Sequence, residues 1–149
     1  MRKMFLSALV AVAALVTAPA VAQPTGLAAM RAEALDLVNA ARAEAGLDPL
    51  TAAPAPEAAA QDHADDMIAR GFYDHTSPDG ETVRDRVLDR GGSPWTVVAE
   101  NIAECRGCEI PPDLDRVRAF HSGWMQSPGH RENILLEGLT SFGFGIASD

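Results

Sequence analysis

Apolar side chains recur every three or four residues over 27–45, which is the spacing of one face of an α-helix. Gly46 follows at the position where a glycine commonly ends a helix. The pattern therefore predicts an amphipathic helix that ends just before Gly46. Its inward positions are Leu27, Met30, Ala34, Leu35, Val38, Ala41 and Ala45.

The same pattern predicts further helices, each with its own start or stop signal. A second helix is expected over 56–69, with a proline in its first turn and Gly71 after its end. A short helix over 82–89 stops at a glycine pair, and a longer one over 114–125 has a single apolar face. Ser127 is the predicted N-cap, and Pro128 the first residue, of a last helix that reaches Leu135.

Two segments have strand character. The first, 96–99, is short and partly β-branched. The second, 141–147, alternates large apolar residues with Gly143 and Gly145, as expected for a strand with one large apolar face. Since helices outnumber strands and the two are mixed in order, the predicted fold class is α+β.

The first residues have the form of a secretory signal peptide. Arg2 and Lys3 precede an apolar stretch that is too short to span a membrane, and Ala20-Val21-Ala22 has the small-residue form of a cleavage site. We expect cleavage between Ala22 and Gln23, a single domain over 23–149, and a secreted or periplasmic location. No later segment is long and apolar enough to predict a membrane span.

The charge of the chain is strongly acidic. The formal net charge is −9, and removal of Arg2 and Lys3 lowers it by two, to −11. Such a balance argues against nucleic acid as a partner. Lys3 is the only lysine, so the expected mature chain offers no lysine for Schiff-base chemistry.

Cys105 and Cys108 are the only cysteines and form a C-x-x-C motif. In an exported protein an even cysteine count first indicates a disulfide, and the glycine within the motif and the two prolines after it indicate a loop. A redox-active pair and half of a zinc site are the alternative interpretations.

Three short clusters carry polar residues that a core does not require: FYDHTSPDG around His75, AENIA around Glu100 and SPGHREN around His130. Their order resembles that of the secreted CAP superfamily, also called the SCP-like extracellular domain. The resemblance starts with the helix LDLVNAARAEAGLDPL, covers almost all of 23–149 and ends with the glycine-rich FGFGIA.

The resemblance implies a three-layer α-β-α sandwich, with helices on both faces of a small antiparallel sheet. It also implies a cleft in which His75, His130 and Glu100 meet. In animal and plant members a second cleft glutamate stands three residues after the helix tryptophan, where this chain has Ser127 after Trp124. Similar domains also continue into a last aromatic-rich strand, so that strand is expected to be missing after Asp149.

Two imidazoles and one carboxylate are the protein ligands of an open zinc site, so Zn or another divalent metal is the candidate cofactor. Without metal, the same groups form a His–Glu pair in which the carboxylate orients an imidazole that acts as a base. The residues are compatible with both chemistries. His75, Glu100 and His130 are therefore candidates both as metal ligands and as catalytic residues.

The remaining polar residues of these segments have simpler expected roles. Asn101 is predicted to brace a loop through its side chain. Glu132 and His63 are predicted to lie on solvated helix faces, whereas His121 is predicted to be a hydrogen-bonded histidine of the core.

Three functions follow from these observations. The main hypothesis is a binding module whose extracellular ligand is a lipid, a peptide or a cell-envelope component, since CAP relatives are linked to lipid binding, cell-wall association and signalling. The alternative is a metal-dependent, peptidase-like hydrolase. The third is an exported redox protein that works through Cys105 and Cys108. The oligomeric state stays open.

Overall fold

The computed structural model describes residues 26–94 and 96–149. The predicted signal peptide and its cleavage site fall within residues 1–25 and so lie outside the described residues. No helix in the described part of the chain is long and apolar enough to cross a membrane.

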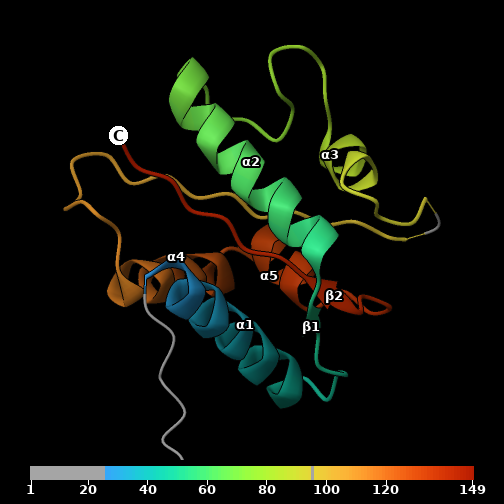
Figure 1. Ribbon diagram of the computed structural model, residues 1–149. Coiled ribbons are helices and arrows are strands. Elements are labelled where there is room, and N and C mark those ends of the chain that lie inside the picture. The colour runs from blue at the N-terminus through green and yellow to red at the C-terminus, as the bar shows by residue number, and fades with distance from the viewer. Residues whose placement is uncertain (1–25, 95) are drawn as a thin grey trace, which may run out of the picture.

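Five helices and two short strands make up the described chain (Figure 1). The elements are α1 (Leu27–Glu44), β1 (Thr51–Ala52), α2 (Pro54–Arg70), α3 (Val83–Asp89), α4 (Leu114–Gln126), α5 (Pro128–Ile134) and β2 (Ser141–Phe142). All five predicted helices are present, and their ends differ from the predicted ones by at most two residues.

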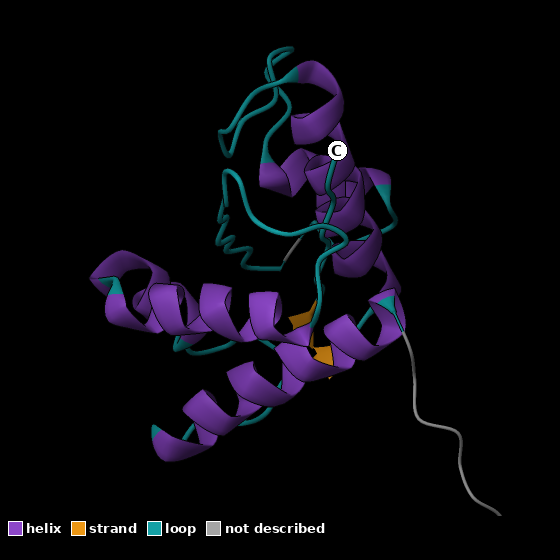
Figure 2. Ribbon diagram, turned by 90° about the vertical axis from the view of Figure 1, so that its left-hand side faces the viewer, coloured by secondary structure: helices purple, strands orange, loops and turns teal. Residues whose placement is uncertain are grey.

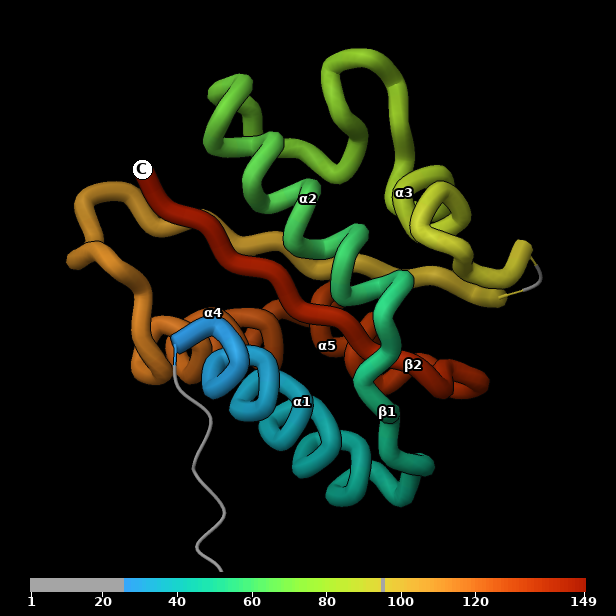
Figure 3. Tube along the Cα trace, viewed as in Figure 1, coloured from blue at the N-terminus to red at the C-terminus, as the bar shows by residue number. Residues whose placement is uncertain are grey.

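The elements are arranged in three layers. α1 packs against α4 and α5 on one side, and α2 packs against α3 on the other. Between these layers run β1, β2 and the extended C-terminal chain, drawn in red in Figure 3, and Figure 2 shows the two strands between the helical layers. The predicted α-β-α architecture is therefore confirmed.

The strand direction differs from the prediction. Thr51 pairs with Ser141 and Ala52 with Phe142 in parallel, not antiparallel. The cause is the chain that follows each strand. β1 leads into α2, and the chain after β2 runs along α2 in the same direction, with Gly143 beside Pro56 and Gly145 beside Ala60.

The predicted strand over 96–99 is not formed, since these residues are extended or bent without strand pairing. Of the second predicted strand, only Ser141–Phe142 has a ladder partner. β-branched residues favour an extended backbone, but a strand also needs a neighbouring chain to accept its hydrogen bonds.

The alternation over 141–147 is nevertheless realised in the packing. Phe144 is buried against Met30 and Ala34 of α1 and Val117 of α4. Phe142 and Ile146 pack against the same core. Gly143 and Gly145 face α2 instead, and a Cβ at either position would overlap backbone atoms of that helix.

Buried Arg42, only 1% exposed, anchors the other end of the helical layer. Its guanidinium donates to the carbonyl of Asp48 at 2.9 Å and to those of Ile134 and Leu136 at 2.9 and 3.0 Å. Because the last carbonyls of a helix have no partner within it, Arg42 joins the end of α1 to the end of α5.

Gly143→Ala is expected to destabilise the protein by about 1–3 kcal/mol or more, because the added methyl overlaps the α2 backbone, which cannot rotate away. Gly123→Ala is the control, since a Cβ at this position meets nothing within 4 Å. The substitution also replaces a glycine inside a helix by a better helix former. The control should be neutral or stabilising by up to about 1 kcal/mol. Urea unfolding of both variants tests this, and equal midpoints would contradict the proposed packing.

Candidate functional site

His75 and Glu100 form a direct pair. The Nδ1 atom of His75 lies 2.7 Å from Oε1 of Glu100. The His75 side chain is 51% exposed, whereas that of Glu100 is only 14% exposed. The carboxylate is therefore a mostly buried support that orients an exposed imidazole.

Arg86 occupies the second oxygen of the same carboxylate. Its Nη2 lies 2.8 Å from Glu100 Oε2 and also donates to the carbonyl of His75 at 3.1 Å. The Arg86 side chain is 4% exposed, so this is a buried charge with a buried partner. Arg86 thus fixes both members of the His75–Glu100 pair.

Sequence reasoning missed Arg86, although a signal was present. Arg86 shares the inward face of α3 with Val83 and Val87, a position that rarely holds an unpaired charge. The helix is positioned by a capping box, in which Thr82 and Asp85 bond each other's backbone N–H groups.

Two asparagines join the Glu100 segment to α5. Asn101 Nδ2 donates to the carbonyl of His130 at 2.9 Å. Asn133 Nδ2 donates to the Glu100 carbonyl at 3.1 Å and to Asn101 Oδ1 at 2.9 Å. The bracing role predicted for Asn101 is confirmed, and Asn133 is a further member that the sequence analysis did not single out.

His130 is half-buried, and its Nδ1 lies 2.9 Å from the hydroxyl of Ser127. Ser127 is the N-cap of α5 as predicted, but its side chain makes no capping hydrogen bond and instead contacts the imidazole. The hydroxyl therefore orients the His130 ring, just as Glu100 orients that of His75.

The predicted third ligand is engaged elsewhere, since both oxygens of Glu100 already have partners. Within residues 26–94 and 96–149, no group of three or more His, Cys, Asp or Glu residues has the arrangement of a metal site. With Nδ1 held by a carboxylate, the Nε2 atom of His75 is the one left to bind a metal. A metal bound here would therefore be held through imidazole nitrogen, and Glu100 would orient the His75 ring.

The two other histidines depart from their predicted roles. His63 is 2% exposed rather than solvated, and its Nε2 lies 2.9 Å from the carbonyl of Asp74. Its ring also contacts that of Phe72. His121 has a buried Nε2 without a hydrogen-bond partner, and burial lowers the pKa of its imidazole. Glu132 is exposed, as expected.

A cavity of about 1110 Å³ opens beside the site, between α2, the segment around 96–112 and the C-terminal chain. Glu100 and Asn101 are polar residues of a lining that is largely apolar. Several apolar side chains of the lining are exposed to solvent, namely Ile68, Tyr73, Val97 and Ile110. Glu100 thus contacts the His75 imidazole and also borders an apolar cavity.

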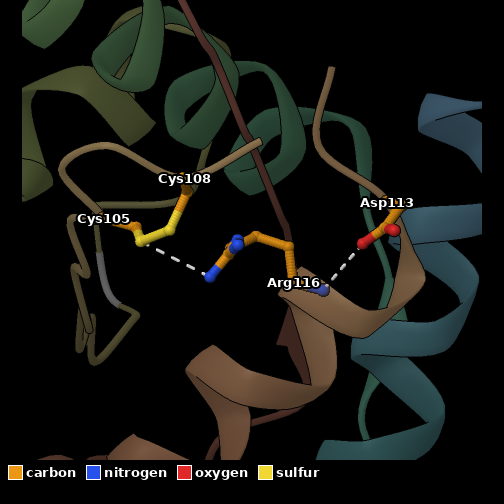
Figure 4. Close-up of a disulfide and its surroundings, with 4 residues drawn as sticks. All are labelled: Cys105, Cys108, Asp113 and Arg116. Carbon is orange, nitrogen blue, oxygen red and sulfur yellow. Dashed lines mark hydrogen bonds between the residues drawn. A yellow bond between two sulfur atoms is a disulfide. The ribbon is translucent and has the colours of Figure 1, made fainter. Parts of the chain in front are cut away.

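Cys105 and Cys108 form the predicted disulfide, with Cα atoms 5.9 Å apart. Both residues lie in the wall of the same cavity. Figure 4 shows Arg116 pointing from the first turn of α4 toward Cys105, with its Nη1 at 3.4 Å from the sulfur.

Comparison with known proteins gives the family. The model of the CAP, or cysteine-rich secretory protein, family matches residues 35–149. The chain belongs to this family. The match contains every residue of the His75, Glu100 and His130 clusters, and the recognition made from the sequence is confirmed.

The relatives are bacterial and longer than this chain. The uncharacterized protein YkwD of Bacillus subtilis is 33% identical over 82% of this chain and 44% of its own length. The uncharacterized membrane protein YlbC of the same organism is 30% identical over 75% of this chain and 30% of its own length. The chain therefore spans less than half of these curated relatives.

Two solved structures share the fold. An extracellular protein containing an SCP domain from Bacillus anthracis has a TM-score of 0.67 and 27% identity, and the match covers 86% of this chain and 42% of that one. An outer surface protein of Borrelia burgdorferi has a TM-score of 0.57 and 22% identity over 73% of this chain and 74% of its own.

Glu100→Gln is expected to destabilise the protein by about 3–5 kcal/mol, because it leaves the buried Arg86 guanidinium without its carboxylate. Glu104→Gln is the matched control, since Glu104 pairs with Arg106, whose side chain is 85% exposed. The control should change stability by less than about 1 kcal/mol. Chemical unfolding measures the loss of stability in both variants. A similarly small loss of stability in the two would contradict the pairing of Glu100 with buried Arg86.

Proposed function

We propose that this protein is an exported binding module that takes an apolar ligand with a polar end. The observation that carries the proposal is the double role of Glu100, which orients His75 and borders the largely apolar cavity of about 1110 Å³. Ligand sites in proteins commonly combine an apolar lining with a few placed polar groups.

The rim of the cavity supports an apolar ligand. Ile68 is 42% exposed, Val97 55% and Ile110 63%, and all three line the same cavity. Exposed apolar side chains gathered at one opening are typical of binding sites. Lipids and other amphipathic molecules of the cell envelope fit this chemistry better than a highly charged ligand.

The hydrogen bonds at the polar end of the site limit which residues could act in a hydrolase. Glu100 has one oxygen on His75 and the other on Arg86, so neither is left to take a proton from water. Ser127 contacts the Nδ1 atom of His130, and no carboxylate in the described part of the chain holds that ring as a serine hydrolase requires. These contacts argue against Glu100 itself as the base and against a serine hydrolase at His130, whereas the His75–Glu100 pair keeps a metal-dependent hydrolase as the second candidate.

A divalent metal such as zinc is part of the proposal. His75 and His130 each have Nδ1 engaged by an oxygen, which directs Nε2 outward as a ligand atom. The consecutive residues Glu100 and Asn101 hold the two histidine-bearing segments, one through the His75 ring and the other through the His130 carbonyl. Bound metal would supply a Lewis acid beside the two imidazoles.

Export is supported by the form of the first residues and by the likeness to an extracellular SCP-domain protein. A secreted or periplasmic location also agrees with the disulfide, because disulfides persist in oxidising compartments.

Ile68→Glu is expected to weaken binding of a fluorescent fatty-acid analogue at least about tenfold, since it places a charge at the apolar rim. Leu136→Glu is the matched control, because Leu136 is 37% exposed and lies outside the cavity lining. Fluorescence titration of both variants measures this. Equal affinity in the two, or no binding by the parent protein, would refute an apolar ligand in this cavity.

His75→Ala with His130→Ala is expected to abolish zinc binding, whereas Glu100→Gln should weaken it about 10–100-fold, as loss of an orienting partner does. His121→Gln removes an imidazole outside the site and should bind zinc like the parent. Competition against a chromophoric chelator gives the affinities. Unchanged zinc content in the double variant would sink the metal proposal and leave the apolar cavity to be judged separately.

A further inference from the structure

The Cys105–Cys108 pair has features that a bracing disulfide does not need. We propose that it is a thiol–disulfide exchange site, in which a partner thiol attacks Cys105 and Arg116 stabilises the Cys105 thiolate. The partner is a reduced dithiol on a protein or peptide. This activity is separate from the binding function proposed above.

Arg116 is held in place to contact the sulfur. Its backbone N–H donates to the Asp113 side chain at 3.0 Å, at the capped start of α4. Its guanidinium lies 6.0 Å from the centre of the Phe120 ring and 3.4 Å, through Nη1, from the Cys105 sulfur (Figure 4). A fixed positive charge beside a cysteine favours the thiolate, which is the reactive form.

The charge of Arg116 is not neutralised by a carboxylate within the part of the chain that the structure describes. The nearby arginines behave differently, since Arg106 pairs with Glu104 and Arg118 pairs with Glu33 and Asp115. Most arginines in the described part of this acidic chain form ion pairs with carboxylates, whereas Arg116 contacts a disulfide sulfur. Its charge is free to act on the sulfur.

The two cysteine residues are also unequal in exposure. Cys105 is exposed, whereas Cys108 is half-buried. Exchange requires that one sulfur be attacked from outside while the other leaves. The exposed sulfur is the one that Arg116 contacts, so access and charge select the same atom.

Other charges around the pair oppose the thiolate in part. Glu104 and Glu109 flank the motif, and Asp115 precedes Arg116 on α4. Arg106 offsets Glu104 at 2.9 Å. Tyr73 has its pKa raised by burial and then by the charge of Glu104, so it is neutral near pH 7. Arg116 is thus the cation in contact with the sulfur against a mostly acidic surrounding.

The reaction balances without a further oxidant. One partner thiolate attacks the Cys105 sulfur, the Cys105–Cys108 bond breaks, and Cys108 leaves with the electron pair and takes a proton. The partner's second thiolate then attacks the partner's first sulfur, which is bonded to Cys105 in the mixed disulfide. Cys105 leaves as a thiolate beside Arg116. The partner dithiol is oxidised to a disulfide, and the cysteine pair is reduced to two thiols.

The first test is the redox equilibrium with glutathione, measured by alkylation of free thiols and mass spectrometry. Arg116→Gln should shift the equilibrium toward the disulfide about tenfold, because the thiolate loses its cation. Arg118→Gln, on the same helix and with the same charge change, should leave it unchanged, and Arg116→Lys should restore most of the effect. Equal shifts in the two Gln variants, or a pair that glutathione leaves fully oxidised, would overturn the proposal.

The second test asks which sulfur reacts. Cys108→Ser leaves Cys105 as a free thiol that should attack a disulfide-bonded peptide and trap a mixed disulfide, with one peptide sulfur leaving as a thiolate, whereas Cys105→Ser should trap at least about tenfold less in the same time. Equal trapping by the two variants would show that Cys105 is not the selected sulfur. Because neither readout depends on zinc or on the fatty-acid analogue, failure here is distinguishable from failure of the binding function.

Discussion

The contact between the C-terminal chain and the backbone of α2 is the constraint on which the other contacts of the fold depend. Gly143 lies against Pro56, and Gly145 lies against Ala60. The two glycines are two residues apart in an extended chain, whereas Pro56 and Ala60 are four residues apart in a helix. Two residues of strand rise about 7 Å and four of helix about 6 Å, so the two repeats nearly match. Residues between and beyond the glycines must point the other way, which places Phe144 in the core.

The same layer arrangement separates two kinds of chemistry around one cavity. On one side, Glu100 is shared by His75 and Arg86 and is tied to α5 by Asn101 and Asn133. On the other, the disulfide loop and Arg116 border the cavity, and no carboxylate in the described part of the chain pairs with this cation. A buried charge that is paired with a carboxylate gives a rigid polar end, and a cation facing sulfur favours the reactive thiolate.

Sequence reasoning succeeded where the signal is local. The helical spacing of apolar residues was sufficient to predict the five helices, and the alternation in FGFGIA was sufficient to predict its apolar face, because the backbone sets both periods. His63 stands among Asp62, Asp65 and Asp66, which favours a solvated face, yet it shares a buried helix face with Ala59, four residues earlier. The pairing of Arg86 with Glu100 could not be found, since the loop that brings the two together has no pattern of its own.

Arg42 has a consequence for how the two histidines respond to a ligand. It donates only to main-chain carbonyls, two of them at the end of α5, so the helix that carries His130 is anchored whatever side chains surround it. His75 stands on a loop, half exposed, and depends on Glu100 and Arg86 for its position. The two imidazoles are therefore unequal in freedom: a ligand that draws them together moves the His75 loop and leaves the His130 helix where it is.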